Sequence, residues 1–89
     1  MATKFEVGRL GITPGAQKQI PMKEVEIAVN RHASGDWGEI CDEDRSQNEW
    51  ALENDARLMS VYESESGEPF WIITEADRSS TTILLPSEY

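Results

Sequence analysis

Residues 57–89 decide the fold, and they read RLMSVYESESGEPFWIITEADRSSTTILLPSEY. Three runs rich in apolar, β-branched and aromatic residues lie near 57–64, 69–75 and 80–85. The turns between them, built around ESG and ADRS, are short enough to join antiparallel neighbours but too short for a parallel crossover. The stretch therefore predicts a three-stranded antiparallel meander.

The middle strand of this meander is apolar on both faces. Phe70 and Ile72 point to one side, whereas Trp71 and Ile73 point to the other. Such a strand is either covered on both sides or leaves one side for a partner. A homodimer through the outer face of the sheet, around Trp71 and Ile73, is one arrangement that this pattern allows.

The N-terminal segment KFEVGRLGIT, residues 4–13, reads as a further strand, which we expect at the edge of the sheet. Its apolar residues alternate in part: Phe5, Val7, Leu10 and Ile12. Thr13 then supplies a helix cap and Pro14 a first helical residue, so a short helical turn should follow.

A first full helix is expected at 21–34, PMKEVEIAVNRHAS. Its apolar face combines residues at helical spacing: Met22, Val25, Ala28, Val29 and His32. Gly35 follows Ser34 and favours a left-handed C-cap. The helix should therefore bury this face against the sheet and end at Ser34.

A second full helix should begin between Asp42 and Ser46 and run to about Asp55. Asp44 or Ser46 would cap it, and Ser46 with Glu49 forms a capping-box pattern. Acidic residues in its first turn suit the helix dipole. The whole chain, residues 1–89, is then one α+β domain: a strand, two helices on one face of the sheet, and the meander.

The apolar stripe of this second helix is broad. Trp50, Ala51 and Leu52 are consecutive and so lie about 100° apart around the axis. Trp50 and Leu52 do not both fit into one core, so one of them should be partly exposed. Such a side chain ringed by carboxylates is typical of a binding surface, although a solvated helix with Trp50 lying flat on the sheet also fits.

Charge limits the classes of partner. The chain has 17 acidic and 8 basic residues, for a net charge of −9, and most of the acids lie between residues 35 and 77. This block repels nucleic acid and anionic membranes, so we expect neither as a direct partner. A basic protein surface fits the charge, and so does an acidic face that only keeps the chain soluble.

Other composition signals concern location. No apolar run approaches the length of a membrane span, and the first residues lack a leader pattern. The single cysteine, Cys41, does not allow an internal disulfide. These signals together predict a cytoplasmic protein.

The segment RHASGDWGEICDEDRSQNEWALEND, residues 31–55, suggests several sites. Residues 42–53 resemble a calcium-binding loop, but Gln47 stands where that loop needs glycine, so we expect no calcium. A transition metal would have to use residues without a repeated ligand spacing: His32, Asp36, Glu39 and Cys41. An enzyme would use Cys41 as nucleophile, His32 as base and Asp36 to orient it, yet no glycine-rich oxyanion loop is present.

A structural interpretation of the same segment needs fewer assumptions. His32 completes the apolar face of its helix, and Gly35 and Gly38 allow sharp backbone turns. Asp36 accepts backbone N–H groups in an Asx turn, and Trp37 anchors the loop against the core. We therefore predict structural roles for these five residues and no cofactor or metal. Outside the segment, Arg78 is expected to pair with Asp77 or Glu75.

Several motifs together support a family resemblance: TPGA, RHASGDWG, the DxxxNExAL helix and ITEADRSSTTILLPSEY. Over nearly its whole length the chain resembles a family of small proteins of bacteria and their plasmids and phages. Members carry labels such as hypothetical, plasmid-related or subunit M of a type I restriction system. The last label implies a methyltransferase, but the chain lacks that enzyme's cofactor-binding and catalytic motifs. The resemblance implies a mobile-element setting and no site residues.

The favoured functional hypothesis is a non-enzymatic, acidic protein-binding module that contacts a host protein. A sharper version is anti-restriction or anti-CRISPR activity, in which the acidic face mimics DNA and occupies a basic nucleic-acid-binding surface. The predicted partner-binding residues lie on the second helix: Asp42, Glu43, Glu49, Trp50 and Glu53. The alternative is a small metal-dependent or cysteine-based enzyme centred on His32, Asp36 and Cys41.

Overall fold

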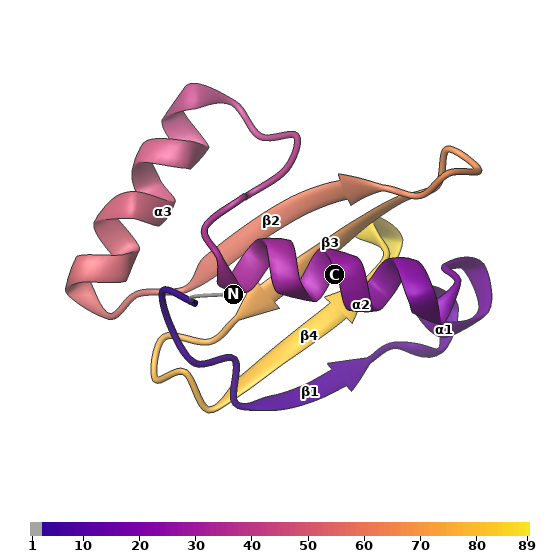
Figure 1. Ribbon diagram of the computed structural model, residues 1–89, viewed down its shortest axis with the longest axis horizontal. Helices are drawn as coiled ribbons and strands as arrows, with labels where there is room; N and C mark the ends of the chain where they lie inside the picture. Colours follow the sequence, from indigo (N-terminus) through magenta and orange to yellow (C-terminus); the bar gives the residue numbers. More distant parts are fainter. Residues whose placement is uncertain (1–2) are drawn as a thin grey trace.

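The predicted meander is present in the computed structural model, which describes residues 3–89 (Figure 1). Strands β2 (Leu58–Glu63), β3 (Pro69–Thr74) and β4 (Ser80–Leu84) pair antiparallel in chain order. Strand β1 (Arg9–Ile12) joins the far side of β4 and runs parallel to it. The sheet order is β1-β4-β3-β2, so the edge position expected for the first strand is confirmed.

β1 is shorter than its sequence pattern indicates. Gly8 has a φ of +67°, and a Cβ at this position would lie 2.4 Å from the carbonyl oxygen of Ser79. The chain therefore turns sharply out of the sheet before Arg9. Phe5, which was expected to lie within the strand, instead stacks on Trp37, with ring centroids 6.1 Å apart.

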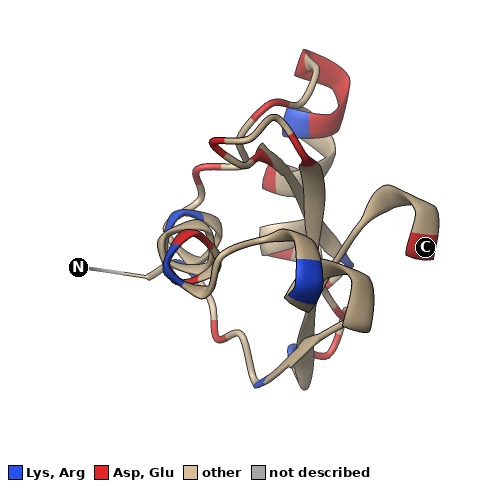
Figure 2. Ribbon diagram, turned by 90° about the vertical axis from the view of Figure 1, so that its right-hand side faces the viewer, with Lys and Arg blue, Asp and Glu red and all other residues tan. Residues whose placement is uncertain are grey.

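The helices are α1 (Pro14–Gln19), α2 (Met22–Ala33) and α3 (Asp42–Asn54). α2 lies across one face of the sheet, whereas α3 stands beside the β2 edge (Figures 1 and 2). A short 3-10 helix, η1 (Pro86–Glu88), ends the chain beyond the opposite face (Figure 2). The α+β class and the helical layer on the sheet are confirmed. The position of α3 refines this prediction, because α3 stands beside the β2 edge and not across the same face as α2.

The main core lies between α2 and the sheet. It combines apolar residues of both layers: Ala16, Ile20, Val25, Ala28, Tyr62, Phe70, Ile72 and Ile83. Met22 was expected to join this core, but its side chain is 53% exposed. It lies at the start of α2, above the margin of the sheet, and contributes instead to a surface groove described below.

The start of α3 differs from the predicted capping. The helix begins at Asp42, with Cys41 as N-cap and no side-chain cap bond. Ser46 lies inside the helix, so the capping roles proposed for Ser46 and Asp44 are wrong. Three consecutive carboxylates in the first turn, beginning with Asp42, still place negative charge at the positive end of the helix dipole.

At the C-terminal end of α3, backbone carbonyl groups accept hydrogen bonds from an arginine of a distant turn. The last turn of the helix has no basic residue, and the guanidinium of Arg78, from the β3–β4 turn, donates to the carbonyl oxygens of Ala51 (2.9 Å) and Ala56 (2.6 Å). Arg78 also donates to the backbone carbonyl of Glu75. Its predicted pairing with the Asp77 or Glu75 carboxylate is wrong, because the guanidinium binds backbone carbonyl oxygens of α3, of the segment that follows it and of the β3–β4 turn instead.

One carboxylate, that of Glu88 in η1, forms hydrogen bonds with the start of α1. Glu88 accepts hydrogen bonds from the Thr13 hydroxyl (2.5 Å) and the Gly15 N–H (2.9 Å). A Cβ on Gly15 would lie 2.6 Å from this carboxylate, so only glycine permits the approach. Glu88 therefore completes the start of α1, where Thr13 also accepts the Ala16 N–H, as its predicted cap role requires.

The outer face of the sheet is partly covered by the C-terminal segment. The ring of Tyr89 packs edge-on against Trp71 at 5.5 Å, and Arg57 donates to the Tyr89 hydroxyl at 3.0 Å. Ile73 and Leu84 are buried beneath this segment's side of the sheet. The apolar outer face of β3 is thus partly covered without a second copy.

The β2 edge is sealed by two different contacts. Val61 exchanges backbone hydrogen bonds with the loop before α3, accepting from Glu39 (2.7 Å) and donating to Trp37 (3.1 Å). The side-chain amide of Asn48 accepts the Met59 N–H (3.2 Å) and donates to the Met59 carbonyl (2.8 Å). These contacts satisfy outward backbone groups that would otherwise attract another strand.

We predict that Arg78→Lys lowers the free energy of unfolding by about 2 kcal/mol, because an ammonium lacks the planar fork that binds several carbonyls. Urea denaturation measures this change. Arg57→Lys is the matched control, since Arg57 is half exposed and, among residues 3–89, pairs only with Glu75 and Tyr89; it should cost less than about 0.5 kcal/mol. Equal losses in the two variants would contradict the role of Arg78.

Candidate functional site

His32 is the most chemically suggestive residue of the chain, and it is fully buried. Its Nδ1 lies 2.5 Å from the Ser60 hydroxyl and its Nε2 lies 2.9 Å from the Thr74 hydroxyl. The ring also packs edge-on against Phe5 and Trp37. Both nitrogens are therefore occupied by hydroxyl groups from the sheet.

The hydroxyl chain fixes where the protons lie. Thr81 donates to the carbonyl of Val7 at 2.7 Å, so its oxygen must accept from Thr74, 2.7 Å away. Thr74 has then used its proton, and its oxygen accepts from Nε2–H of His32. The hydrogen bonds therefore place a proton on Nε2, and in a neutral ring Nδ1 accepts from the Ser60 hydroxyl.

Burial also favours the neutral ring. Desolvation, with a smaller contribution from the nearby charge of Arg78, lowers the pKa of His32 to about 4. Every buried side-chain nitrogen and oxygen atom of residues 3–89 has a hydrogen-bond partner. These contacts fit the structural role predicted for His32, and the sequence analysis did not identify the hydroxyl groups that provide them.

The alternative site at His32, Asp36 and Cys41 is not assembled. Asp36 is exposed and forms a two-pronged ion pair with Arg31, at 2.7 and 3.2 Å, which lowers the pKa of Asp36. Cys41 is exposed at the start of α3. Among residues 3–89, no three His, Cys, Asp or Glu side chains are close enough to hold a metal ion, Glu39 included.

The SGDWG segment forms contacts that fit the structural roles predicted for its residues. Asp36 accepts the Gly38 N–H at 3.3 Å in an Asx turn, and Gly35 and Gly38 have φ values of +85° and +77°. Trp37 is 1% exposed and packs with Ala51 of α3. The loop therefore fixes α3 against the end of the sheet.

The acidic α3 surface consists of the predicted partner-binding residues, all of which are exposed: Asp42, Glu43, Glu49, Trp50 and Glu53. Trp50 is 53% exposed and Leu52 is half-buried, as the broad apolar stripe predicted. Figure 2 shows acidic residues along α3, interrupted by one basic position. Glu49 has a further role, because its carboxylate accepts the indole N–H of Trp37 at 3.0 Å.

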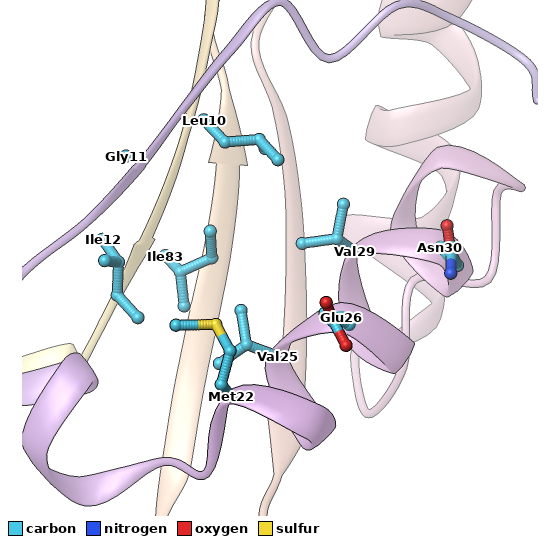
Figure 3. Close-up of a pocket in the computed structure, with 9 residues that line it drawn as sticks. All are labelled: Leu10, Gly11, Ile12, Met22, Val25, Glu26, Val29, Asn30 and Ile83. Carbon is cyan, nitrogen blue, oxygen red and sulfur yellow. The ribbon is translucent and has the colours of Figure 1, made fainter.

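A second surface feature, the β1–α2 groove, was missed by the sequence analysis. It has a volume of about 560 Å³ and is lined mainly by apolar side chains (Figure 3): Leu10, Ile12, Met22, Val25, Val29 and Ile83. Glu26 and Asn30 lie at its polar margin. Leu10 and Met22 could have indicated this groove. Each continues an apolar pattern of its strand or helix, but both lie outside the buried core.

Comparisons with protein-family models, with curated proteins and with solved structures found no match. Within residues 3–89, no helix has the length and apolar character needed to span a membrane.

We predict that stability falls at mildly acidic pH because His32 is neutral in the fold. His32 binds a proton near pH 6.5 in the unfolded chain and only near pH 4 in the folded chain. Its contribution to the free energy of unfolding is therefore fully present above pH 6.5 and is lost as the pH falls from 6.5 to 4. The free energy of unfolding should fall by about 1 kcal/mol between pH 6 and pH 5. Urea denaturation at each pH measures it.

His32→Gln is the matched variant for this prediction. It should lower stability at neutral pH by about 1–2 kcal/mol and remove the extra loss between pH 6 and pH 5. Proton NMR gives an independent measurement, because the chain has one histidine. An imidazole that titrates near pH 6.5 in the folded protein would refute the buried neutral ring.

Proposed function

We propose that the chain is a non-enzymatic protein-binding module and that the acidic α3 surface contacts its partner. The observation that carries the proposal is Trp50, a large aromatic side chain that is 53% exposed on a helix otherwise covered with carboxylates. Aromatic residues enclosed by a polar rim are enriched at the centres of protein interfaces. Solubility explains the carboxylates but gives no reason for the indole.

The arrangement of α3 supports the same proposal. Its inward side is fixed by Ala51, which is fully buried, and by Asn48, which holds the β2 edge. Trp50 and Glu53 therefore project from a helix that is held at several points. A rigid helix loses little conformational entropy on binding, and this favours affinity.

Charge indicates the chemistry of the partner. The helix carries five carboxylates against one arginine, so a basic surface is complementary and an anionic one is repelled. Host proteins that bind nucleic acid present such surfaces. An anti-restriction or anti-CRISPR role, in a plasmid or phage setting, is the sharper form of the proposal, with the partner's DNA site as the contact.

An enzymatic function centred on His32, Asp36 and Cys41 is less supported. His32 has no solvent exposure, and both of its nitrogens are hydrogen-bonded to hydroxyl groups. Asp36 is occupied by Arg31 and does not orient the imidazole. A binding function requires no rearrangement of these contacts.

We predict that Trp50→Ala reduces capture of the partner from a bacterial lysate at least tenfold, because it removes the central apolar contact. Its melting temperature should stay within a few degrees of wild type, since Trp50 lies largely outside the core. Capture by the immobilised protein, followed by quantitative mass spectrometry, measures the change. Ile27→Ala is the matched control, because Ile27 is 54% exposed on α2, and it should capture normally.

Charge supplies a second arm of the same experiment. Glu53→Lys should weaken capture, and capture by the wild type should fall as salt rises. Duplex DNA should release the partner if the acidic surface occupies a DNA-binding site. Loss of folding in Trp50→Ala, or capture that ignores both substitutions, would reject the acidic α3 surface as the binding site.

A further inference from the structure

The β1 edge of the sheet is open, unlike the β2 edge. The N–H groups of Arg9 and Thr13 donate to β4 and its preceding turn, at 3.0 Å each. Because backbone groups alternate in direction along a strand, those of Leu10 and Ile12 face away from β4. Within residues 3–89 nothing covers them, and Figure 1 shows no helix or strand beyond β1. An open edge of this kind is a template for strand addition.

Apolar side chains accompany these unpaired backbone groups. Leu10 and Ile12 point from β1 toward α2, where they form one wall of the β1–α2 groove (Figure 3). Leu10 is 52% exposed. A strand added at this edge would therefore gain main-chain hydrogen bonds and an apolar contact together, which is the usual chemistry of β-strand addition.

We infer that this edge binds a second copy of the chain, with the two β1 strands antiparallel about a two-fold axis at Gly11. In this register Leu10 of each copy lies opposite Ile12 of the other. Every outward N–H and C=O group of these two residues then finds its counterpart in a hydrogen-bonded pair. Leucine meets isoleucine on the groove side, so the apolar wall continues from one copy into the next.

Gly11 suits the centre of such an axis. The two Gly11 residues would form a non-hydrogen-bonded pair, in which the Cα atoms approach to about 4.5 Å. Gly11 has open space on its outer side, with no atom within 4 Å of a Cβ position. Glycine at this point removes the side-chain contact that would otherwise fall on the axis itself.

Charge complementarity selects a second copy over an unrelated strand. The same register places Arg9 opposite Thr13 of the other copy, and the Thr13 hydroxyl holds the Glu88 carboxylate at 2.5 Å. Arg9 is exposed and forms no ion pair with any described residue. Each Arg9 then lies near the Glu88 that the opposite Thr13 holds, so the pairing sets a cation near an anion at both ends and Leu10 against Ile12 between them.

The interface is small, because β1 has only four residues, and the net charge of each copy opposes association. We therefore expect a dimer with a dissociation constant in the micromolar range. Sedimentation equilibrium from micromolar to millimolar protein should show a monomer–dimer equilibrium. Leu10→Lys, which places a charge at the edge, and Arg9→Glu, which sets a carboxylate against Glu88, should each weaken the dimer at least tenfold.

Ile27→Lys is the matched control for Leu10→Lys, since Ile27 is as exposed but lies beside Tyr62 and Phe70. It should dimerise like wild type. Hydrogen exchange by NMR tests the register directly. The Leu10 and Ile12 amides should gain protection as concentration rises, whereas the Arg9 amide, bonded to Ser79, should be protected throughout.

Two results would overturn the inference. The first is a protein that stays monomeric up to millimolar concentration. The second is a dimer that survives Leu10→Lys and leaves the Leu10 and Ile12 amides unprotected, which would place the interface on another surface, such as the outer face of the sheet. Circular dichroism of each variant separates loss of pairing from loss of folding.

Discussion

A buried neutral imidazole holds the two layers of this domain together. His32 extends from α2 into the sheet and contacts hydroxyl groups on β2 and β3, and Thr81 extends the chain of hydrogen bonds to β4 and the segment before β1. A core of this size buries limited apolar area. A hydrogen-bonded network whose donors and acceptors all match adds a strict geometric requirement, because any shift of α2 along the sheet leaves a buried polar group unpaired.

Two helix ends are completed by residues from remote parts of the chain. Arg78 binds the carbonyl groups at the end of α3, and Glu88 binds the start of α1. Both contacts place the charge that complements the helix dipole. The motifs TPGA, RHASGDWG, NEWAL and EADRSSTTILLPSEY thus each supply a contact within the fold. This leaves exposed residues, rather than these contacts, as the place to look for function.

The sequence predicts the parts of the fold that depend on neighbours along the chain. Short links and alternating apolar residues are enough for the meander, and helical spacing is enough for α2. The SGDWG turn also follows from local chemistry. The hydroxyl partners of His32 do not, because Ser60, Thr74 and Thr81 are ordinary strand residues until the register brings them together. The role of Arg78 and the parallel pairing of β1 likewise depend on contacts between segments that lie far apart in sequence.

The same division holds for the candidate surfaces. The exposure of Trp50 follows from three consecutive large or apolar residues on one helix, so local geometry is sufficient. The β1–α2 groove is formed by residues whose patterns individually indicate core. It exists because the sheet ends at β1 while the apolar side chains of α2 extend past it, and only the assembled layers reveal that difference in width.

The sealed β2 edge determines what kind of assembly strand addition could produce. A sheet with two open edges can add copies at both, and head-to-tail addition then continues into a fibre. Here Asn48 and the loop before α3 occupy the β2 edge, so each copy has one edge free for strand pairing. Pairing of two β1 edges leaves no free edge in either copy. The combined sheet therefore stops growing at two copies, because both of its outer edges are β2 edges that are already covered.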